Sequence, residues 1–243
     1  MLALLKKEIN AFFNNLLGYI VISVFLLIIG LFLWVFPTDF NIIQSGYASL
    51  DGLFVFGPFV LLFLVPAITM RFFSDELKSG TIEVLFTKPV SDLQVILSKL
   101  IAGMILVILS ILPTLIYVIT VYRLGLPVGN LDMGATWGSY VGLLLIGFSF
   151  VAIGLFCSTI TDNQVVSFVL AVFASAFIFV GFELIYTLDL FGQADLFIRS
   201  LGMYSHYTSL SRGVIDTRDL IYFASLLAIF ITLAKVRLES RKW

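Results

Sequence analysis

Residues 74–91 read Ser-Asp-Glu-Leu-Lys-Ser-Gly-Thr-Ile-Glu-Val-Leu-Phe-Thr-Lys-Pro-Val-Ser, a polar segment between two long apolar ones. The apolar neighbours have the length and composition of helices that cross a bilayer. The polar segment is too short to fold as a domain, and its turn and cap residues are too regularly placed for a plain spacer. It predicts a small helical element that a membrane protein presents to a cytoplasmic partner.

The composition of the whole chain agrees with a membrane protein. Of its 243 residues, 60% are hydrophobic and 12% are charged, whereas an average soluble domain carries about 25% charge. The only cysteine, Cys157, excludes an intrachain disulfide. A net charge of −1 gives no indication of nucleic-acid binding. These values predict an integral membrane protein.

Six apolar stretches are long enough to span a membrane, which takes roughly 20 residues. Backbone groups cannot stay unpaired in lipid, and the stretches do not alternate as barrel strands do, so all six are predicted to be helices. The first is too long for a signal peptide and is expected to stay uncleaved. The sequence thus predicts a single all-α transmembrane domain over residues 1–243, with spans near Leu16–Phe36, Leu53–Phe73, Lys99–Val121, Gly138–Ile160, Val165–Tyr186 and Leu220–Lys235.

The positive residues indicate an orientation, because cytoplasmic loops are enriched in Lys and Arg. Six spans with a cytoplasmic N-terminus place ten of the 14 positive residues inside and four outside. Both termini are then cytoplasmic. The inner group is Lys6, Lys7, Arg71, Lys78, Lys88, Lys99, Lys235, Arg237, Arg241 and Lys242; the outer group is Arg123, Arg199, Arg212 and Arg218.

Residues 1–15 predict an amphipathic helix on the cytoplasmic surface. At 100° per residue the apolar side chains fall within one arc, and the polar ones, among them Lys6, Lys7 and Glu8, fall outside it. Such a helix lies in the interface plane. Two interpretations remain open: a simple surface anchor, or an elbow helix that also touches a partner.

The cytoplasmic segment 74–98 divides into helix, stop, short helix, stop and helix. Gly80 supplies a left-handed stop, and Thr81 caps a short helix whose first turn holds Glu83. Pro89 ends that helix because it lacks an N–H group. Ser91 begins a capping box for the next helix. An ordinary capped connector would show the same pattern.

The sequence contains no motif that binds a nucleotide, neither a phosphate-binding loop nor a dinucleotide fingerprint. One His and one Cys cannot build a zinc site. An intramembrane hydrolase would need Ser149 and His206 as a catalytic pair. The residues that flank Ser149 are bulky and His206 is expected in a loop, so Ser149 is better explained as a helix-packing hydroxyl.

Glu183 is the one carboxylate well inside an apolar stretch. An ionisable group at mid-bilayer costs about 3 kcal/mol, so its side chain must face protein or water. It is either an interfacial carboxylate or part of a substrate path, to which Ser149 could also belong. The following extracytoplasmic loop, residues 187–219, is the longest connection and is expected to be interfacial or re-entrant in its first part.

Together these features resemble the ABC-2 type permease family. Its members carry an acidic stretch, a Gly-Thr-x-Glu motif and a Pro-Val-Ser-like segment between the second and third spans. The corresponding residues here are Asp75-Glu76, Gly80-Thr81-Ile82-Glu83 and Pro89-Val90-Ser91. In that family this segment is the coupling helix that docks on the nucleotide-binding subunit. The resemblance implies coupling roles for Asp75, Glu76, Gly80, Thr81, Glu83 and Pro89. Three neighbours in the same segment, Lys78, Phe86 and Lys88, are further candidates for contact with that subunit.

Within the family, the chain is most similar to permeases associated with gliding motility. This narrower resemblance lies in residues 161–164, Thr-Asp-Asn-Gln, and in residues 206–216. It implies a separate ATPase that binds ATP and Mg²⁺, a second permease subunit that could carry a large extracytoplasmic domain, and a place in the bacterial inner membrane.

The expected function is therefore that of a permease subunit of an ATP-driven exporter, with no enzymatic activity of its own. Two alternatives remain open. One is a mechanical or scaffold subunit that passes ATP-driven motion to an extracytoplasmic partner, and the other is the hydrolase. The sequence does not separate transport from transmission of motion, and it does not indicate the substrate.

Overall fold

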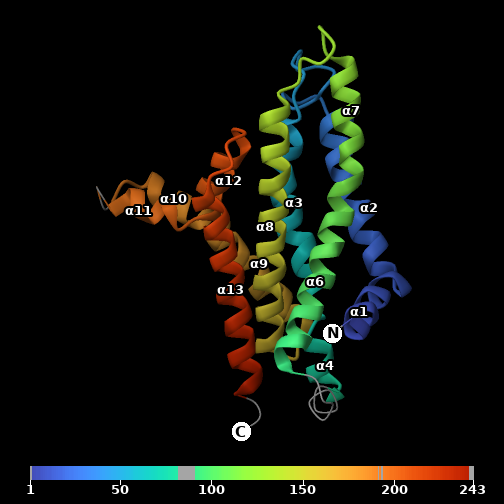
Figure 1. Ribbon diagram of the computed structural model, residues 1–243, viewed down its shortest axis with the longest axis vertical. Helices are drawn as coiled ribbons and strands as arrows, with labels where there is room; N and C mark the ends of the chain where they lie inside the picture. The colour runs from blue at the N-terminus through green and yellow to red at the C-terminus, as the bar shows by residue number, and fades with distance from the viewer. Residues whose placement is uncertain (1, 82–90, 191, 193, 241–243) are drawn as a thin grey trace.

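The computed structural model describes residues 2–81, 91–190, 192 and 194–240, and every regular element in them is a helix (Figure 1). Six of the helices are long and apolar enough to cross a membrane, which confirms the predicted fold class. Both chain ends lie at the same end of the bundle, as an even number of crossings requires. The six spans run Leu16–Val35, Asp51–Lys78, Asp92–Leu124, Met133–Ile160, Gln164–Thr187 and Thr217–Glu239.

Several spans contain more than one helical segment. The first joins α2 (Leu16–Gly30) to a π-helical turn, and the fifth joins α9 (Gln164–Ala176) to α10 (Phe182–Thr187) through another. The second consists of α3 (Asp51–Thr69) and the short α4 (Ser74–Lys78). The third consists of α6 (Asp92–Ile111) and α7 (Leu115–Leu124), and Pro113 lies in the 3₁₀ turn between them. The last, α13 (Thr217–Glu239), is unbroken.

The third span is longer than its apolar run predicts. The predicted range began at Lys99, but α6 begins at Asp92 because Ser91 caps it: the Ser91 hydroxyl accepts from the backbone N–H of Gln94 at 3.4 Å. This confirms the predicted cap and moves Lys99 from the edge of the span to its buried second turn.

Helix α8 (Met133–Ile160) is the centre of the bundle and packs against α3, α6, α9 and α13. Glycines allow the closest approaches. A Cβ atom on Gly138 would collide with the carbonyl oxygen of Leu210, and one on Gly154 would collide with the side chain of Thr69. Close helix contact through small residues is the usual way in which membrane helices associate.

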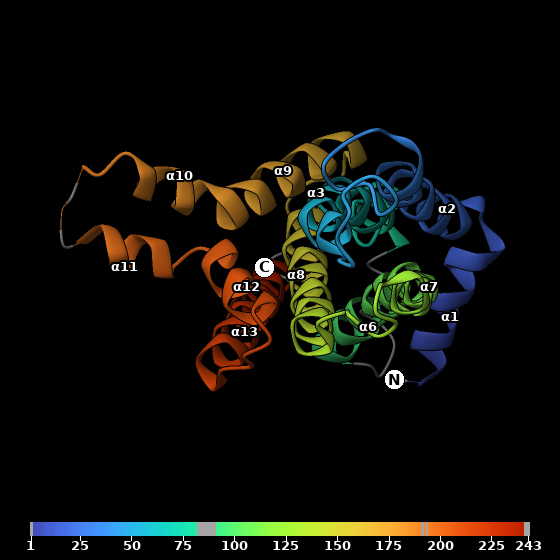
Figure 2. The same cartoon turned by 90° about the horizontal axis from the view of Figure 1, so that it is seen from above.

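Helix α1 (Leu2–Asn14) packs against α2 and α6 near the lower end of the bundle in Figure 1, and Figure 2 shows it at the side of the bundle. The predicted helix is thus present, and its place at a membrane interface stays a prediction. One residue departs from the predicted pattern: Glu8, which falls outside the apolar arc, is buried at 9% exposure. The reason is a specific ion pair that burial of apolar area does not predict.

Residues 187–219 are not a simple loop. They contain α11 (Ala194–Ser200) and α12 (Met203–Ser211). Helices α10 and α11 pack against each other and project sideways from the bundle, below the upper ends of α7 and α8 (Figure 1). Helix α12 packs against α8 and α13. The expectation that His206 lies in a loop is therefore wrong, because it is part of α12.

Candidate functional site

At the end of the bundle that holds both termini, a buried lysine joins three helices. The Nζ atom of Lys99 on α6 lies 2.9 Å from Oε1 of Glu76 on α4 and 3.2 Å from Oε1 of Glu8 on α1. The Lys99 side chain is only 3% exposed, and its ammonium group also lies 5.1 Å from the centre of the Phe73 ring. We call Glu8, Glu76 and Lys99 the buried ion triad.

The triad alone carries one negative charge, which a fourth residue at its edge, Lys7, balances. Two carboxylates face one buried ammonium group, and the exposed Lys7 lies 3.5 Å from Glu8 and 3.7 Å from Glu76. Buried charges need partners because their desolvation costs several kcal/mol each. Removing one member leaves an uncompensated charge. The triad therefore ties α1, α4 and α6 into one unit.

A second set of contacts fixes α4 to the other side of the bundle. The buried Ser74 hydroxyl donates to the carbonyl oxygen of Ser158 on α8 at 3.2 Å. The side-chain amide of Gln164, the first residue of α9, donates to the carboxylate of Asp75. Helix α4 is thus tied to α1 and α6 on one side and to α8 and α9 on the other.

Only part of the predicted coupling segment can be compared with the structure. Gly80 has a φ of +68°, which agrees with its predicted left-handed stop. The Thr81 hydroxyl lies 2.8 Å from that of Ser79. Lys78 borders a small depression with Asp162 and Gln164. The predicted short helix after Thr81 lies outside the described residues, as do four predicted coupling residues: Glu83, Phe86, Lys88 and Pro89.

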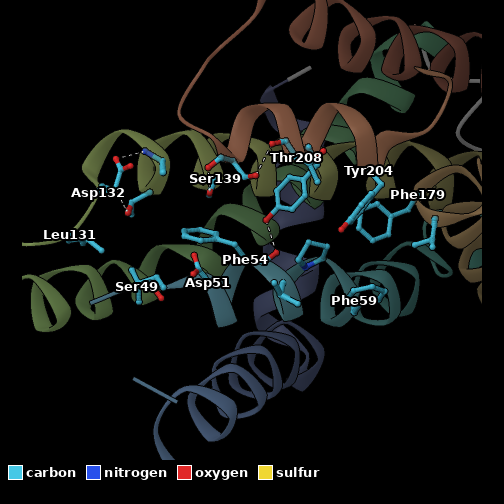
Figure 3. Close-up of a pocket in the computed structure, with 18 of the residues that line it drawn as sticks. Ser49, Asp51, Phe54, Phe59, Leu131, Asp132, Ser139, Phe179, Tyr204 and Thr208 are labelled. Atoms are coloured by element: carbon cyan, nitrogen blue, oxygen red, sulfur yellow. Dashed lines mark hydrogen bonds between the residues drawn. The ribbon is translucent and has the colours of Figure 1, made fainter. Parts of the chain in front are cut away.

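At the opposite end of the bundle lies a cavity of about 500 Å³. Its walls come from α3, the start of α8, the fifth span and α12 (Figure 3). Glu183, a predicted substrate-path residue, is among the residues that line it. Ser149 is not: it is buried in α8 and donates to the carbonyl oxygen of Leu145 at 2.9 Å. The two residues therefore do not share a site.

A hydrogen bond in the cavity wall compensates for a proline. Pro58 cannot donate to the carbonyl oxygen of Phe54, four residues earlier in α3. The Tyr207 hydroxyl on α12 donates to that oxygen instead, at 2.6 Å. Burial raises the pKa of Tyr207 far above its ordinary value of 10, so the hydroxyl keeps its proton and remains a donor.

Glu183 has a cationic partner that the sequence did not reveal. Its Oε2 atom accepts from Nε of Arg199 on α11 at 3.1 Å, and the Arg199 guanidinium lies 4.9 Å from the centre of the Tyr186 ring. This pair joins α10 to α11. It also explains how a carboxylate is tolerated within an apolar run.

His206 joins α12 to α13. Its Nδ1 lies 2.7 Å from a carboxylate oxygen of Asp219, its Nε2 lies 2.9 Å from the carbonyl oxygen of Ser200, and its ring stacks on Tyr222 at 3.9 Å. Both ring nitrogens are thus engaged away from Ser149, which argues against the hydrolase. Among the described residues no cluster of His, Cys, Asp and Glu could hold a metal ion.

The geometry defines a multi-pass helical membrane protein with a charge-paired segment at one end and a cavity at the other. A family model described as ABC-2 family transporter protein matches residues 36–234, more than half of the chain. The chain belongs to the ABC-2 transporter family, the membrane-spanning part of ABC transporters, whose permeases normally work with an ABC ATPase subunit. No match was found among curated proteins.

The sequence analysis did not predict the buried ion triad. Lys99 was counted only as one of the cytoplasmic positive residues, although it follows an apolar turn and begins a long apolar run. A lysine in that position needs a partner, which is the signal that could have found it. Nothing in the spacing indicated that the partners would be Glu8 and Glu76, because they are 91 and 23 residues away.

Proposed function

We propose that this chain is the permease subunit of an ATP-driven exporter, energised by a separate ATPase that docks on residues 74–98. ATP and Mg²⁺ would bind to that ATPase and not to this chain. The observation that carries the proposal is the buried ion triad, since it makes the start of the docking segment mechanically continuous with α1 and α6.

The contacts of α4 explain how motion of the docking segment would be transmitted to the other helices. Motion of the docking segment moves α4, which directly continues the second span. Lys99 passes the displacement to α6 and α1, and Asp75 passes it to α9 through Gln164. Packed helices move as rigid bodies, so a shift at one end opens or closes the bundle elsewhere.

The orientation and the assembly follow from this role. With the ATPase in the cytoplasm, the end that holds both termini is cytoplasmic and the cavity faces the extracytoplasmic side of a bacterial inner membrane. Six spans form half of a translocation unit. A second permease subunit completes it, either another copy of this chain or a different subunit with a large extracytoplasmic domain.

The cavity supports transport over the mechanical alternative. A subunit that only transmitted motion would need packed helices between its two ends. A cavity of about 500 Å³ with polar groups in its wall instead has the size of a small-molecule site, about 300–1,000 Å³.

A role in gliding motility stays a hypothesis that depends on residues 161–164 and 206–216. In the structure the first of these motifs contacts α4 through Gln164, and the second contains His206 and its ties to α13. Because both motifs make contacts that hold helices together, their presence gives no separate support for a role in gliding. Loss of colony spreading on deletion of the gene, restored by this chain, would support the hypothesis.

A charge reversal in the docking segment tests the proposal. Glu83→Arg is expected to abolish co-purification of the ATPase while the chain still inserts in the membrane. The matched control is Glu239→Arg, the same change at an exposed position at the end of α13 on the same side of the bundle. Intact co-purification of the Glu83 variant, or equal loss in both, would contradict docking on this segment.

A further inference from the structure

We propose that the cavity between α3, α8, the fifth span and α12 binds an amphipathic organic cation. The inference deepens the proposed function by naming a substrate class, and it rests on that function only for the statement that the bound cation is transported. The binding site itself follows from the charge, the aromatic lining and the size of the cavity.

The charge of the lining is negative. Asp51, Asp132 and Glu183 line the cavity, and none of the described residues that line it is Lys, Arg or His. Two of the three carboxylates have partners: Asp132 accepts from the backbone N–H of Ala135 at 3.0 Å, and Glu183 is paired with Arg199. Figure 3 shows Asp51 and Asp132 on two facing walls.

Of the three carboxylates, Asp51 is the one whose charge is not paired within the described residues. Within the described part of the chain its side chain makes no hydrogen bond and no ion pair, and it is exposed at the start of α3. A ligand that enters the cavity meets this carboxylate, whose negative charge attracts a cation and repels an anion.

One side of the cavity is aromatic, with Phe59, Phe179 and Tyr204 close together (Figure 3). Phe59 and Phe179 lie edge to face with ring centres 5.6 Å apart, and Tyr204 continues the row at 5.9 Å from Phe179. Phe59 remains 44% exposed, so its ring is available to a ligand. Aromatic faces bind the apolar body of a ligand and also attract cationic charge. The combination with Asp51 fits an amphipathic cation better than a sugar, an anion or a plain lipid tail.

The experiment uses a pair of probes that differ in the sign of their charge. Tetraphenylphosphonium and tetraphenylborate have nearly the same shape and hydrophobicity. Each is titrated in equilibrium dialysis against the full chain in phosphatidylcholine nanodiscs, and binding to empty nanodiscs is subtracted. We expect saturable binding of the phosphonium cation and none of the borate anion.

Variants locate the site. Asp51→Asn is expected to weaken phosphonium binding by about tenfold, as loss of a charge-assisted contact does, whereas Asp51→Glu restores it. Asp39→Asn is the matched control, because Asp39 is an exposed carboxylate of the segment before α3 that does not line the cavity. Phe59→Leu is expected to weaken binding of the cation by severalfold.

Equal saturable binding of both probes would overturn the inference, because it would show a lipophilic site without charge selection. So would absence of phosphonium binding, or an equal effect of the Asp51 and Asp39 variants. If Asp51→Asn does not fold, the comparison of the two probes on the wild-type chain still decides. If the cation does not bind but the ATPase co-purifies, the cation site is wrong and the proposed function stands. If the cation binds but no ATPase co-purifies, the binding site stands and the transport role is wrong.

Discussion

The two ends of the bundle differ in whether their carboxylates are paired inside the protein. At the end that holds the termini, Glu8 and Glu76 are turned inward and share the buried ammonium group of Lys99. At the other end, Asp51 lines a cavity and has no partner among the described residues. Carboxylates satisfied inside the protein hold helices together, whereas one left open can be satisfied by a ligand.

This difference in carboxylate pairing suggests that motion is transmitted at the end with the triad and that a ligand binds at the end with the cavity. The triad ties α1, α4 and α6 into one unit, which suits transmission of motion from the proposed docking segment. The cavity wall is held by a hydrogen bond between α12 and α3, from Tyr207 to Phe54, and leaves a space between the same helices. Variants at each end sharpen or break this contrast.

The largest effect is expected from Lys99→Met. Loss of the ammonium group leaves two carboxylates partly buried without their partner, and breaking such a pair costs about 3–5 kcal/mol. We expect a much lower unfolding temperature in detergent. The control is Lys235→Met, which removes an exposed lysine paired with Glu239 at 3.6 Å and should change stability by less than about 1 kcal/mol.

A triple variant separates charge from packing in that result. Lys99→Met combined with Glu8→Gln and Glu76→Gln removes every charge of the triad, and replacing a whole buried ion group is often close to neutral. Recovery of most of the lost stability is expected. A triple variant as unstable as the single one would show that Lys99 stabilises the bundle by its packing and not by its charge.

The next effect is expected from Tyr207→Phe at the cavity end. The carbonyl oxygen of Phe54 then loses its donor opposite Pro58, and an unpaired buried acceptor costs about 1–3 kcal/mol. Because burial raises the pKa of Tyr207, the loss should be the same between about pH 5 and pH 9. Thermal unfolding across that range measures it. Tyr204→Phe, for which no comparable bond is present in the described residues, should have no such effect.

A smaller effect is expected from Ser91→Ala, which removes the cap of α6. Loss of an N-cap hydroxyl costs about 1 kcal/mol. The thermal midpoint should fall slightly, and Ser240→Ala at the exposed end of α13 should leave it unchanged. An unchanged midpoint in Ser91→Ala would mean that packing alone sets the start of α6.

The smallest effect on stability is expected from Arg199→Gln, because Arg199 is 38% exposed and such pairs contribute about 0–1 kcal/mol. Its effect on the cavity should be more informative. Without Arg199, Glu183 gains effective negative charge, so tetraphenylphosphonium should bind about two- to threefold more tightly. Weaker binding would show that the pair shapes the cavity instead of tuning its charge.

The sequence predicted the helices well, because spans are set by long apolar runs and helix starts by local signals. Ser91 and Gly80 were placed correctly from their own chemistry. The apolar run of the third span begins only at Lys99, but the cap at Ser91 correctly predicted where its helix starts. The helices α11 and α12 were missed because their short polar stretches have no clear apolar period.

The candidate site was predicted only in part, for a different physical reason. Glu183 was recognised as a residue that must face protein or water, and it does, but its partner Arg199 was not foreseen. The pairs at the end that holds the termini join residues far apart in the chain, such as Glu8 and Lys99 or Asp75 and Gln164. Such contacts depend on the packing of whole helices, and no local spacing encodes them.

The most direct measurement is co-purification of the tagged full-length chain from native membranes in mild detergent, with stoichiometric partners identified by mass spectrometry. The proposed function predicts an ATPase with a phosphate-binding loop in the purified complex, released by Glu83→Arg and retained by Glu239→Arg. A chain that purifies without any ATPase, under conditions that keep a control ABC complex intact, would contradict it.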